Sequence, residues 1–318
     1  MNTGNAGGRR IVFVNRFFYP DHSATSQILG DLAFELAHQG WAVEVVTSRM
    51  SYDKADAEMP QHEVVKGVRI HRVWSTRFGR AHLLGRALDY ITFYLGAAAT
   101  LWRRVDHDTV VVAKTDPPLI SVLAAPIASL RGARLVNWLQ DLFPEVASTL
   151  GMQLVQGPIL KLLRAVRNIS LRNATNVVLG DRMHAIVRAQ NVSSDRIHII
   201  HNWADGESIR PVPHDSNPLR DEWQLAGRFV IGYSGNLGRA HEFSTILDAA
   251  QLLAEQTDLV FLFVGAGAQL RGVEDQVRQR GLTNVRFQAY QRRELLHLSL
   301  GVADAHLVSL NPALEGLI

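Results

Sequence analysis

The chain has 318 residues, which is longer than one hydrophobic core usually organises, so two domains of about 150 residues each are expected. Hydrophobic residues make up 47% and charged residues 20%, as in ordinary globular proteins, and the absence of cysteine excludes disulfides, thiolate metal ligands and a cysteine nucleophile. The net charge of +3 favours anionic partners such as phosphates, nucleic acid or anionic lipid, without choosing among them.

Residues 1–9 are polar and rich in glycine, so they predict a flexible tail. They lack the apolar stretch of a secretory signal, which favours a cytoplasmic location.

From residue 10 onward, short runs of Val and Ile alternate with helical periodicity, the pattern of an α/β protein with parallel strands. A helix after the first strand is predicted to be capped by Ser23 or Ser26 and to end at Gly40. The predicted strands of the first half are Ile11 to Asn15, Ala42 to Thr47, Val68 to Val73, Val110 to Ala113, Leu135 to Trp138, Asn176 to Leu179 and Ile197 to Ile200.

The segment 202–227 is polar and contains three prolines, so it is predicted to link an N-terminal domain, 10–201, to a second domain, 228–318. In the second domain the βα rhythm resumes with FVIGYSGNLG and stops after about four strands, so we expect this domain to be truncated. The pattern predicts two Rossmann-like, doubly wound domains that face a central cleft and bind ligands at the carboxyl ends of their strands.

The first strand-to-helix loop, NRFFYPDHSATSQ, has no G-x-G-x-x-G fingerprint, which argues against a dinucleotide-dependent dehydrogenase. It places Asp21, His22 and Ser23 ahead of a helix N-terminus, a position that suits an anionic or hydroxylated ligand. We assign these residues to acceptor binding. The alternative is that Ser23 and Ser26 merely cap the helix.

Two further loops of the first half carry carboxylates. TDPPL follows one buried strand and contains Asp116, and QDLFPE follows another and contains Asp141 and Glu145. Asp116 is assigned to acceptor binding, and Asp141 to orienting an acceptor hydroxyl or stabilising positive charge on a sugar. The alternative is that Asp141 caps a turn shaped by Pro144.

The second domain contains two glycine loops that follow strands. YSGNLGRAHEF and FVGAGAQL allow close backbone approach to a phosphate, although tight βα turns also require glycine. The predicted donor-binding residues in these loops are Gly235, Asn236, Arg239, His241, Gly265 and Gly267. Glu315, near the end of the chain, can bind sugar or ribose hydroxyls, although an isolated acid is more often a surface residue.

The sequence contains no paired carboxylates or histidine cluster at metal-ligand spacing, so we expect neither an essential metal nor another cofactor. We also expect no nucleic-acid partner.

In order and spacing, HNWAD, YSGNLG, FVGAG, NVRFQAY and PALEGL resemble the retaining family 4 glycosyltransferases of GT-B fold. The FYPD, DPPL and QDLFPE segments most resemble the WbuB-like enzymes of bacterial cell-surface polysaccharides. By this resemblance Gly235 lines the donor diphosphate, and Glu315 is the first glutamate of an E-x7-E motif, which contacts the donor sugar, so Glu315 is assigned with Asp141 to the catalytic residues. Asn202 matches an interdomain asparagine, assigned to donor binding, and Asp141 falls where relatives carry a catalytic-pocket His or acid.

The resemblance implies transfer of a sugar, with retention, from a nucleotide diphosphate sugar to a polyprenyl-linked saccharide acceptor. It departs from the family pattern at Asn236 and His241, which stand where many relatives have an Arg and a Lys on the diphosphate. The alternatives are a GT-B nucleotide-sugar epimerase and a non-catalytic nucleotide-sugar-binding module.

Two segments are candidates for an anionic membrane surface. Residues 87–102 are mostly apolar but too few to span a bilayer, so they predict an interfacial or buried helix. In a second predicted helix one side is basic and the other is apolar and expected to face the core; the basic side fits either a lipid surface or plain solvent. Its basic residues are Lys161, Arg164, Arg167 and Arg172, and its apolar residues are Ile159, Leu162, Leu163, Val166 and Ile169.

Overall fold

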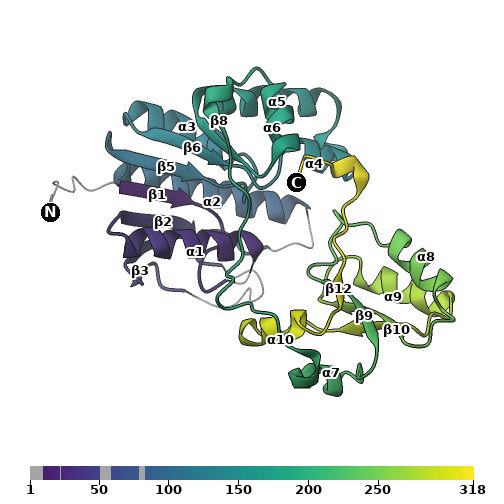
Figure 1. Ribbon diagram of the computed structural model, residues 1–318. Helices are drawn as coiled ribbons and strands as arrows, with labels where there is room; N and C mark the ends of the chain where they lie inside the picture. Colours follow the sequence, from purple (N-terminus) through teal and green to yellow (C-terminus); the bar gives the residue numbers. More distant parts are fainter. Residues whose placement is uncertain (1–9, 22, 51–58, 79–82) are drawn as a thin grey trace. The chain divides into compact units, whose positions relative to one another are not determined.

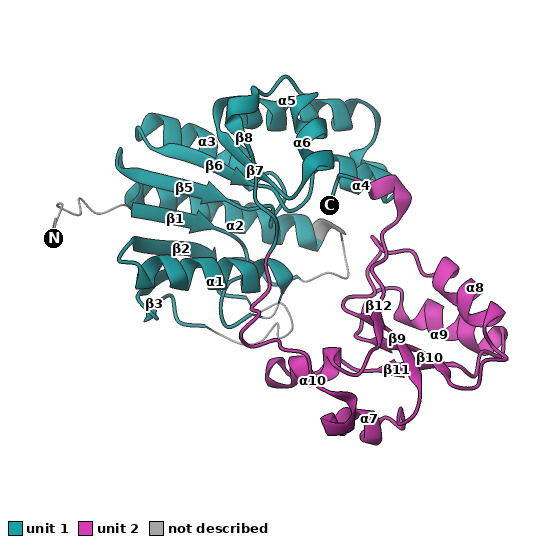
Figure 2. Ribbon diagram, in the orientation of Figure 1, with its two compact units in different colours: residues 1–202, 316–318 teal, residues 203–315 magenta. Residues whose placement is uncertain are grey.

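The computed structural model describes residues 10–21, 23–50, 59–78 and 83–318. The chain divides into two compact units, which Figure 2 shows in different colours. Unit 1 comprises Met1–Asn202 and Gly316–Ile318, and unit 2 comprises Trp203–Glu315. The predicted tail, 1–9, and the candidate residue His22 lie outside the described residues.

Unit 1 is built on an eight-stranded sheet with the order β3-β4-β2-β1-β5-β6-β7-β8 (Figure 1). All neighbouring strands are parallel except β3, which runs antiparallel to β4 at the edge. The strands are β1 Arg10–Val14, β2 Ala42–Ser48, β3 His62–Val65, β4 Val68–Val73, β5 Thr109–Ala113, β6 Arg134–Trp138, β7 Thr175–Val178 and β8 Ile197–Ile199.

Helices cover both faces of this sheet. Alternate residues of β1 point to opposite faces, so Phe13 packs with Leu29 of α1 while Val12 and Val14 pack with Phe93 of α2. The helices α3 and α5 lie on the same face as α2. The helices are α1 Ala24–His38, α2 Leu83–Arg104, α3 Ile120–Leu130, α4 Glu145–Thr149, α5 Gly157–Asn173 and α6 Asp181–Arg188.

Unit 2 contains a four-stranded parallel sheet with the order β11-β10-β9-β12. One face of this sheet packs aromatic and aliphatic side chains with α8 and α9, and the other packs against Leu219, Trp223 and Leu225. The elements are α7 Pro218–Glu222, β9 Phe229–Ser234, α8 Ser244–Leu252, β10 Leu259–Val264, α9 Leu270–Gln279, β11 Val285–Gln288, α10 Leu296–Leu300 and β12 Ala305–His306.

The sequence predicted the α/β class, and the strands of the first half lie within two residues of their predicted bounds. It missed β3, a short edge strand. The segment predicted as a linker, 202–227, differs most, because from residue 203 onward it belongs to unit 2. Leu219, Trp223 and Leu225 are buried against β9 and β10, so hydrophobic burial folds the second part of this segment onto the unit.

The orientation predicted for α5 was wrong for four of the nine residues assigned to its two sides, whereas Leu163 and Val166 are half-buried and Lys161 and Arg172 are exposed. Its apolar residues Ile159, Leu162 and Ile169 are exposed, whereas Arg167 is buried. The reason is a partner on another element, because Arg167 forms a two-pronged ion pair with the buried Glu145 of α4 at 3.0 and 2.9 Å. This contact turns Arg167 inward and leaves Arg164 half-buried.

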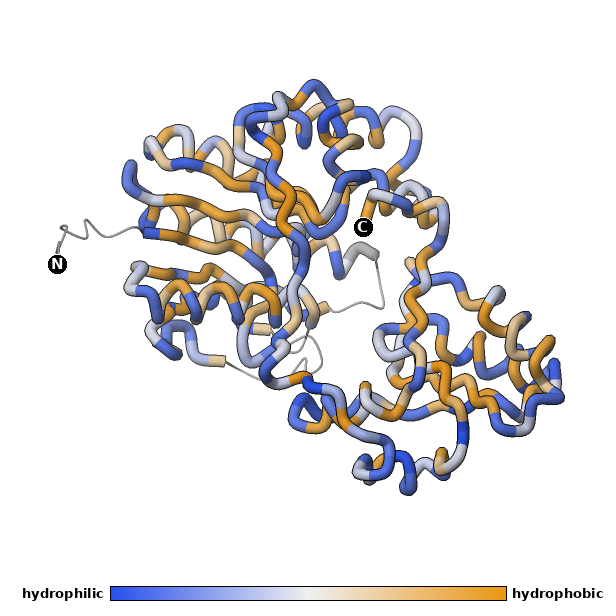
Figure 3. Tube along the Cα trace, viewed as in Figure 1, coloured by the Kyte–Doolittle hydropathy of each residue, from blue (hydrophilic) through white to orange (hydrophobic). Residues whose placement is uncertain are grey.

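The strands of unit 1 show as hydrophobic segments in Figure 3. Within the described ranges, no helix is both long enough and apolar enough to cross a bilayer. The predicted apolar segment, 87–102, lies in α2, which buries one side and exposes the other.

Candidate functional site

Three loops of unit 1 meet at the carboxyl edge of its sheet because β1, β2 and β5 are parallel neighbours. The Arg16 amide donates to the Asp116 carbonyl at 2.7 Å, and the Arg16 carbonyl accepts from the Thr47 hydroxyl at 2.9 Å. The Lys114 amine donates to the Thr25 carbonyl at 3.0 Å, which ties the end of β5 to α1. The loops therefore form one connected support.

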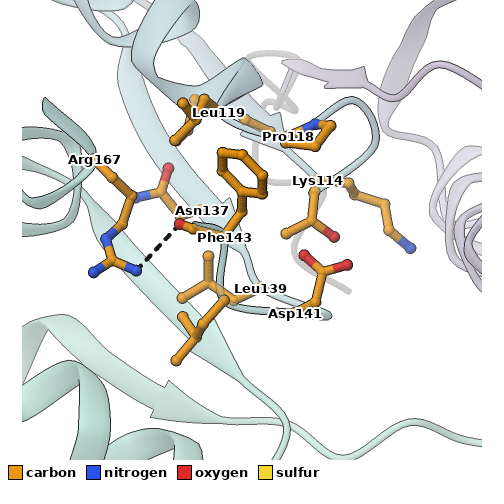
Figure 4. A pocket seen from close by; sticks show the side chains of 12 residues that line it. Lys114, Pro118, Leu119, Asn137, Leu139, Asp141, Phe143 and Arg167 are labelled. Carbon is orange, nitrogen blue, oxygen red and sulfur yellow. Dashed lines mark hydrogen bonds between the residues drawn. The ribbon is translucent and has the colours of Figure 1, made fainter. Parts of the chain in front are cut away.

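A pocket opens beside this support, between the loops after β5 and β6 (Figure 4). Arg167 lies at one side of the pocket and Lys114 and Asp141 at the other, with the Phe143 ring between them. The pocket is lined by Ala113, Lys114, Thr115, Pro118, Leu119, Ser121, Asn137, Leu139, Asp141, Leu142, Phe143 and Arg167.

Asp141 is the acidic residue of this pocket. Burial and the charge of Asp116 raise the pKa of its carboxyl from 3.8 to about 7, against a smaller opposite effect of the hydrogen bond from Thr115. A carboxyl with a pKa near neutrality can exchange a proton with a hydroxyl near pH 7. The structure thus brings the predicted acids Asp116 and Asp141 into electrostatic contact.

Lys114 is a buried cation that the sequence analysis did not select. Its amine lies 3.9 Å from the centre of the Trp138 ring, in a cation–π arrangement. Burial lowers the pKa of Lys114 to about 7, although Asp116 partly opposes this effect. A lysine at the end of the apolar run VVVAK was the available sequence signal.

Glu145 and Asn202 have partners in unit 1. Glu145, weighed with Asp141 in the sequence, pairs with both Arg164 and Arg167, so its charge stabilises the α4–α5 packing. Asn202 exchanges two side-chain hydrogen bonds with Gln140, at 3.1 and 3.2 Å. Asn202, which was predicted to bind the donor, therefore lies beside Gln140, the residue that precedes Asp141.

The first loop, between β1 and α1, contains the two serines that were predicted to cap α1. The Asp21 carboxylate accepts from the Ser23 amide at 2.8 Å, and Ser26 donates to the Asp21 carbonyl. Ser23 occupies the N-cap position, but its hydroxyl makes no capping hydrogen bond and is buried without a partner among the described residues. Neither Ser23 nor Ser26 therefore caps α1 with its side-chain hydroxyl.

In unit 2, the two predicted glycine loops pack directly on each other. The Gly235 amide donates to the Val264 carbonyl at 3.0 Å, and the Leu237 amide donates to the Ala266 carbonyl at 2.9 Å. A Cβ at Gly265 would lie 2.0 Å from the Gly235 oxygen, and one at Gly267 would lie 2.5 Å from the Leu237 oxygen. Gly265 and Gly267 are thus required for loop packing.

Gly235 has a different environment. Its φ of 155° disfavours other residues, yet a Cβ there would meet only the Tyr233 hydroxyl, at 3.9 Å. The space beside this glycine is open, as a ligand that approaches the backbone closely would require.

The remaining predicted donor residues follow Gly235 in the same loop. His241 is oriented by a hydrogen bond of 2.5 Å between its Nδ1 and the Ser309 carbonyl, and its ring packs on Tyr233. Asn236 and Arg239 are exposed. The loop is also held by Gln269, whose side chain donates to the carbonyls of Gly238 and His241.

Glu315 lies in unit 2 directly after the 3-10 helix η5, Pro312–Leu314, and is exposed. η5 is capped by Asn311, whose side chain accepts from the Ala313 amide and whose own amide donates to Ala240 of the Gly235 loop. The segment before Glu315 is therefore attached to the loop that carries the candidate donor residues.

Sequence reasoning also missed Gln269 and Ser309, since their roles depend on contacts between loops.

In the part of the chain that the structure describes, no group of three His, Asp or Glu side chains is arranged to hold a metal ion.

Two α/β sheets, parallel except at the edge strand β3, carry candidate ligand loops at their strand ends, and the chain superposes on proteins of the GT-B fold. Sucrose-phosphate synthase from Thermosynechococcus elongatus matches with a TM-score of 0.73 and 17% identity, over 94% of this chain and 74% of that one. Anabaena HepE, crystallised with UDP and glucose, matches with a TM-score of 0.63 and 17% identity, over 94% and 73%.

Sequence similarity is more specific than the fold. The Glycosyl transferase 4-like domain matches residues 24–203, more than half of the chain, and the chain belongs to this family. WbjE, a candidate glycosyltransferase of Pseudomonas aeruginosa, is 27% identical over 76% of this chain and 60% of its own length. WcaI of Escherichia coli K12, a candidate colanic acid biosynthesis glycosyl transferase, is 30% identical over 57% and 46%. The chain thus spans about half to three fifths of these relatives.

Proposed function

We propose that this chain supplies the acceptor side and part of the donor side of a retaining glycosyltransferase of cell-surface polysaccharide biosynthesis. It transfers a hexosyl or N-acetylhexosaminyl group from a nucleotide diphosphate sugar to a polyprenyl-linked saccharide, at the cytoplasmic face of the membrane. Family membership supports the reaction class, and the relative named for colanic acid biosynthesis supports the polysaccharide role. The similarity to HepE, solved with UDP, supports a nucleotide-linked donor.

The pair of interlocked glycine loops in unit 2 carries this proposal. Gly265 and Gly267 let the two loops touch, and this contact holds Gly235 with open space beside its backbone. Arg239 lies in the same loop and adds hydrogen-bond donors for a diphosphate, and His241 Nδ1 donates to the Ser309 carbonyl, which fixes the orientation of the ring. The proposed site binds phosphate mainly through the backbone, with little fixed charge.

The proposed reaction is a front-face substitution. The bond between the sugar C1 and the diphosphate oxygen breaks, and the bond from C1 to the acceptor oxygen forms on the same face. The acceptor proton passes to the departing diphosphate. Asp141 orients the acceptor hydroxyl in this scheme, and burial, together with the charge of Asp116, raises the pKa of the Asp141 carboxyl so that it is only partly ionised near pH 7.

The test is calorimetric titration of this chain, and of a version extended to the full length of its relatives, with UDP, GDP and their sugar conjugates. Binding of one nucleotide by the longer chain, followed by acceptor-dependent release of that nucleotide, supports the transferase and names the donor base. Sugar inversion without acceptor would replace it by an epimerase. Binding without turnover would identify a non-catalytic module, and no binding by either chain would remove the donor assignment.

A further inference from the structure

We propose that the outer surface of the helices α2 and α5 is a docking surface for an anionic lipid membrane, with both helices lying in the plane of the lipid headgroups. This inference goes beyond the proposed sugar transfer, because it concerns the side of these helices that faces away from the sheet. We call this surface the α2–α5 face.

The helix α2 exposes a continuous apolar stripe. Leu88, Ile91, Leu95 and Trp102 follow one another at intervals of three, four and seven residues, so they lie on one side of the helix. Their side chains are 46–66% exposed, although the opposite side of α2 contributes Phe93, Ala97 and Leu101 to the core. A helix that packs on a sheet normally presents polar residues to solvent, so this second stripe is not explained by folding.

The helix α5 repeats the pattern. Ile159, Leu162 and Ile169 are 50–63% exposed, while Arg167 points inward to its ion pair with Glu145. The helix α3 packs against both α2 and α5 and contains no charged residue. The three helices therefore form one layer that is unusually apolar on its outer side.

The charges of this layer are of one sign. Asp89 is the only acid in α2, α3 and α5, and it is buried, where it accepts hydrogen bonds from Thr76 and Phe78. The exposed charged residues on these helices are all basic, namely Arg86, Arg103, Arg104, Lys161 and Arg172; Arg131 follows α3, and the acids Asp106 and Asp108 lie beyond the end of α2. Apolar residues bordered by exposed cations are what an anionic bilayer surface attracts.

The same charges argue against a second copy of the chain as the occupant. A two-fold contact would place this face against itself, and its arginines would then find no exposed acid on the partner's α2, α3 or α5. An anionic headgroup layer has no such repulsion, and its hydrocarbon boundary accepts leucine and tryptophan side chains.

The test is co-sedimentation of the protein with vesicles made of equal parts phosphatidylglycerol and phosphatidylcholine, and with vesicles of phosphatidylcholine alone. We expect binding to the anionic vesicles that weakens with added salt. Replacing Leu95 and Leu162 by Glu should lower the partition constant at least tenfold. The double variant Arg103→Gln, Arg104→Gln should lower it about fivefold for each charge removed.

Matched controls come from unit 2, where Leu252 and Arg271 are exposed on α8 and α9. Leu252→Glu and Arg271→Gln should bind vesicles like the unchanged protein, and circular dichroism checks that every variant is folded. Equal binding to both vesicle types, no binding, or equal losses in the controls would overturn the proposal. So would a dimer, seen by gel filtration, that Leu95→Glu converts to a monomer. Donor titration in the same variants should be unchanged, which separates this test from that of the transferase.

Discussion

The strand ends of the two units carry different kinds of chemistry. In unit 1 the loops after β5 and β6 present titratable side chains, since Lys114 and Asp141 both have a pKa of about 7. In unit 2 the loops after β9 and β10 present glycine backbone, with Gly265 and Gly267 packed on the neighbouring loop. The same βα architecture thus holds side chains in one unit and main chain in the other.

This difference has a physical consequence for how each site fails. A site made of side chains loses chemistry when one group is replaced by an isostere, while its fold remains. A site made of interlocked backbone loses its geometry when any extra atom enters. The predictions below separate these two kinds of failure.

The largest effect is expected for Gly265→Val. The new side chain would begin 2.0 Å from the Gly235 oxygen, at a φ of 151° that valine disfavours, so the two loops must separate. We expect unit 2 to lose about 3 kcal/mol or more of unfolding free energy, measured by denaturant titration, and donor binding to become undetectable. Gly272→Ala is the control, because this glycine lies in α9 with open space around it and the change should be neutral or slightly stabilising. Equal stability of both variants would contradict the packing role of Gly265.

Gly235→Asp should be less damaging to the fold but severe for the ligand. The space beside Gly235 is open, so the carboxylate fits, yet it would bring a negative charge to the place proposed for the diphosphate. We expect donor affinity, measured by calorimetry, to fall by roughly a hundredfold or more. Gly206→Asp adds the same charge at an exposed site of unit 2 and should leave affinity unchanged. Unaltered affinity in Gly235→Asp would show that the donor does not approach this loop.

Asp141→Asn should separate chemistry from donor binding. The amide keeps the size of the side chain but lacks the negative charge with which Asp141 orients the acceptor hydroxyl, so we expect transfer to slow by about ten- to a hundredfold with donor affinity nearly intact. Transfer by the unchanged protein should rise with pH through about 7 as Asp141 ionises, and this step should vanish in the variant. Full activity in Asp141→Asn would remove the residue from the catalytic group.

The same carboxyl makes a prediction about stability. The pKa of Asp141 is raised in the folded chain from its ordinary value of 3.8, so between about pH 4 and pH 7 the unfolded chain is ionised while the folded chain keeps its proton. The contribution of Asp141 to the unfolding free energy therefore falls as the pH rises from about 4 to about 7, and it stays constant at higher pH. Asp141→Asn should flatten the fall, and at pH 8 the variant should be more stable by up to about 3 kcal/mol in denaturant titrations.

The sequence predicted the strands and loops that can be recognised from the hydrophobic pattern of neighbouring residues. The apolar runs of β1, β2 and β4 and the loops after β5 and β6 follow from periodicity, and the structure has them close to the predicted bounds. It did not predict β3, because HEVV is a four-residue edge strand whose exposed residues resemble a loop.

Contacts between residues far apart in the sequence limit what could be predicted from the sequence. The ion pair of Glu145 with Arg167 spans 22 residues and buries an arginine that helical spacing alone assigned to the exposed side of α5. Gly265 and Gly267 look like phosphate-binding glycines in sequence, but their close neighbours are Gly235 and Leu237 of another loop. The identity of a candidate residue was readable in both cases, whereas its role depended on a partner that spacing does not reveal.

The smallest effect is expected for Arg239→Ala, which tests whether the donor site of unit 2 uses side-chain charge at all. Arg239 is exposed, so its attraction for a diphosphate is screened by water and salt. We expect donor affinity to fall about fivefold at low salt and by less at high salt, without change in stability. Arg271→Ala removes an exposed arginine from α9 and should leave affinity unchanged. A loss of a hundredfold for Arg239→Ala would mean that the site relies on fixed charge, and the contrast between a side-chain site in unit 1 and a backbone site in unit 2 would no longer hold.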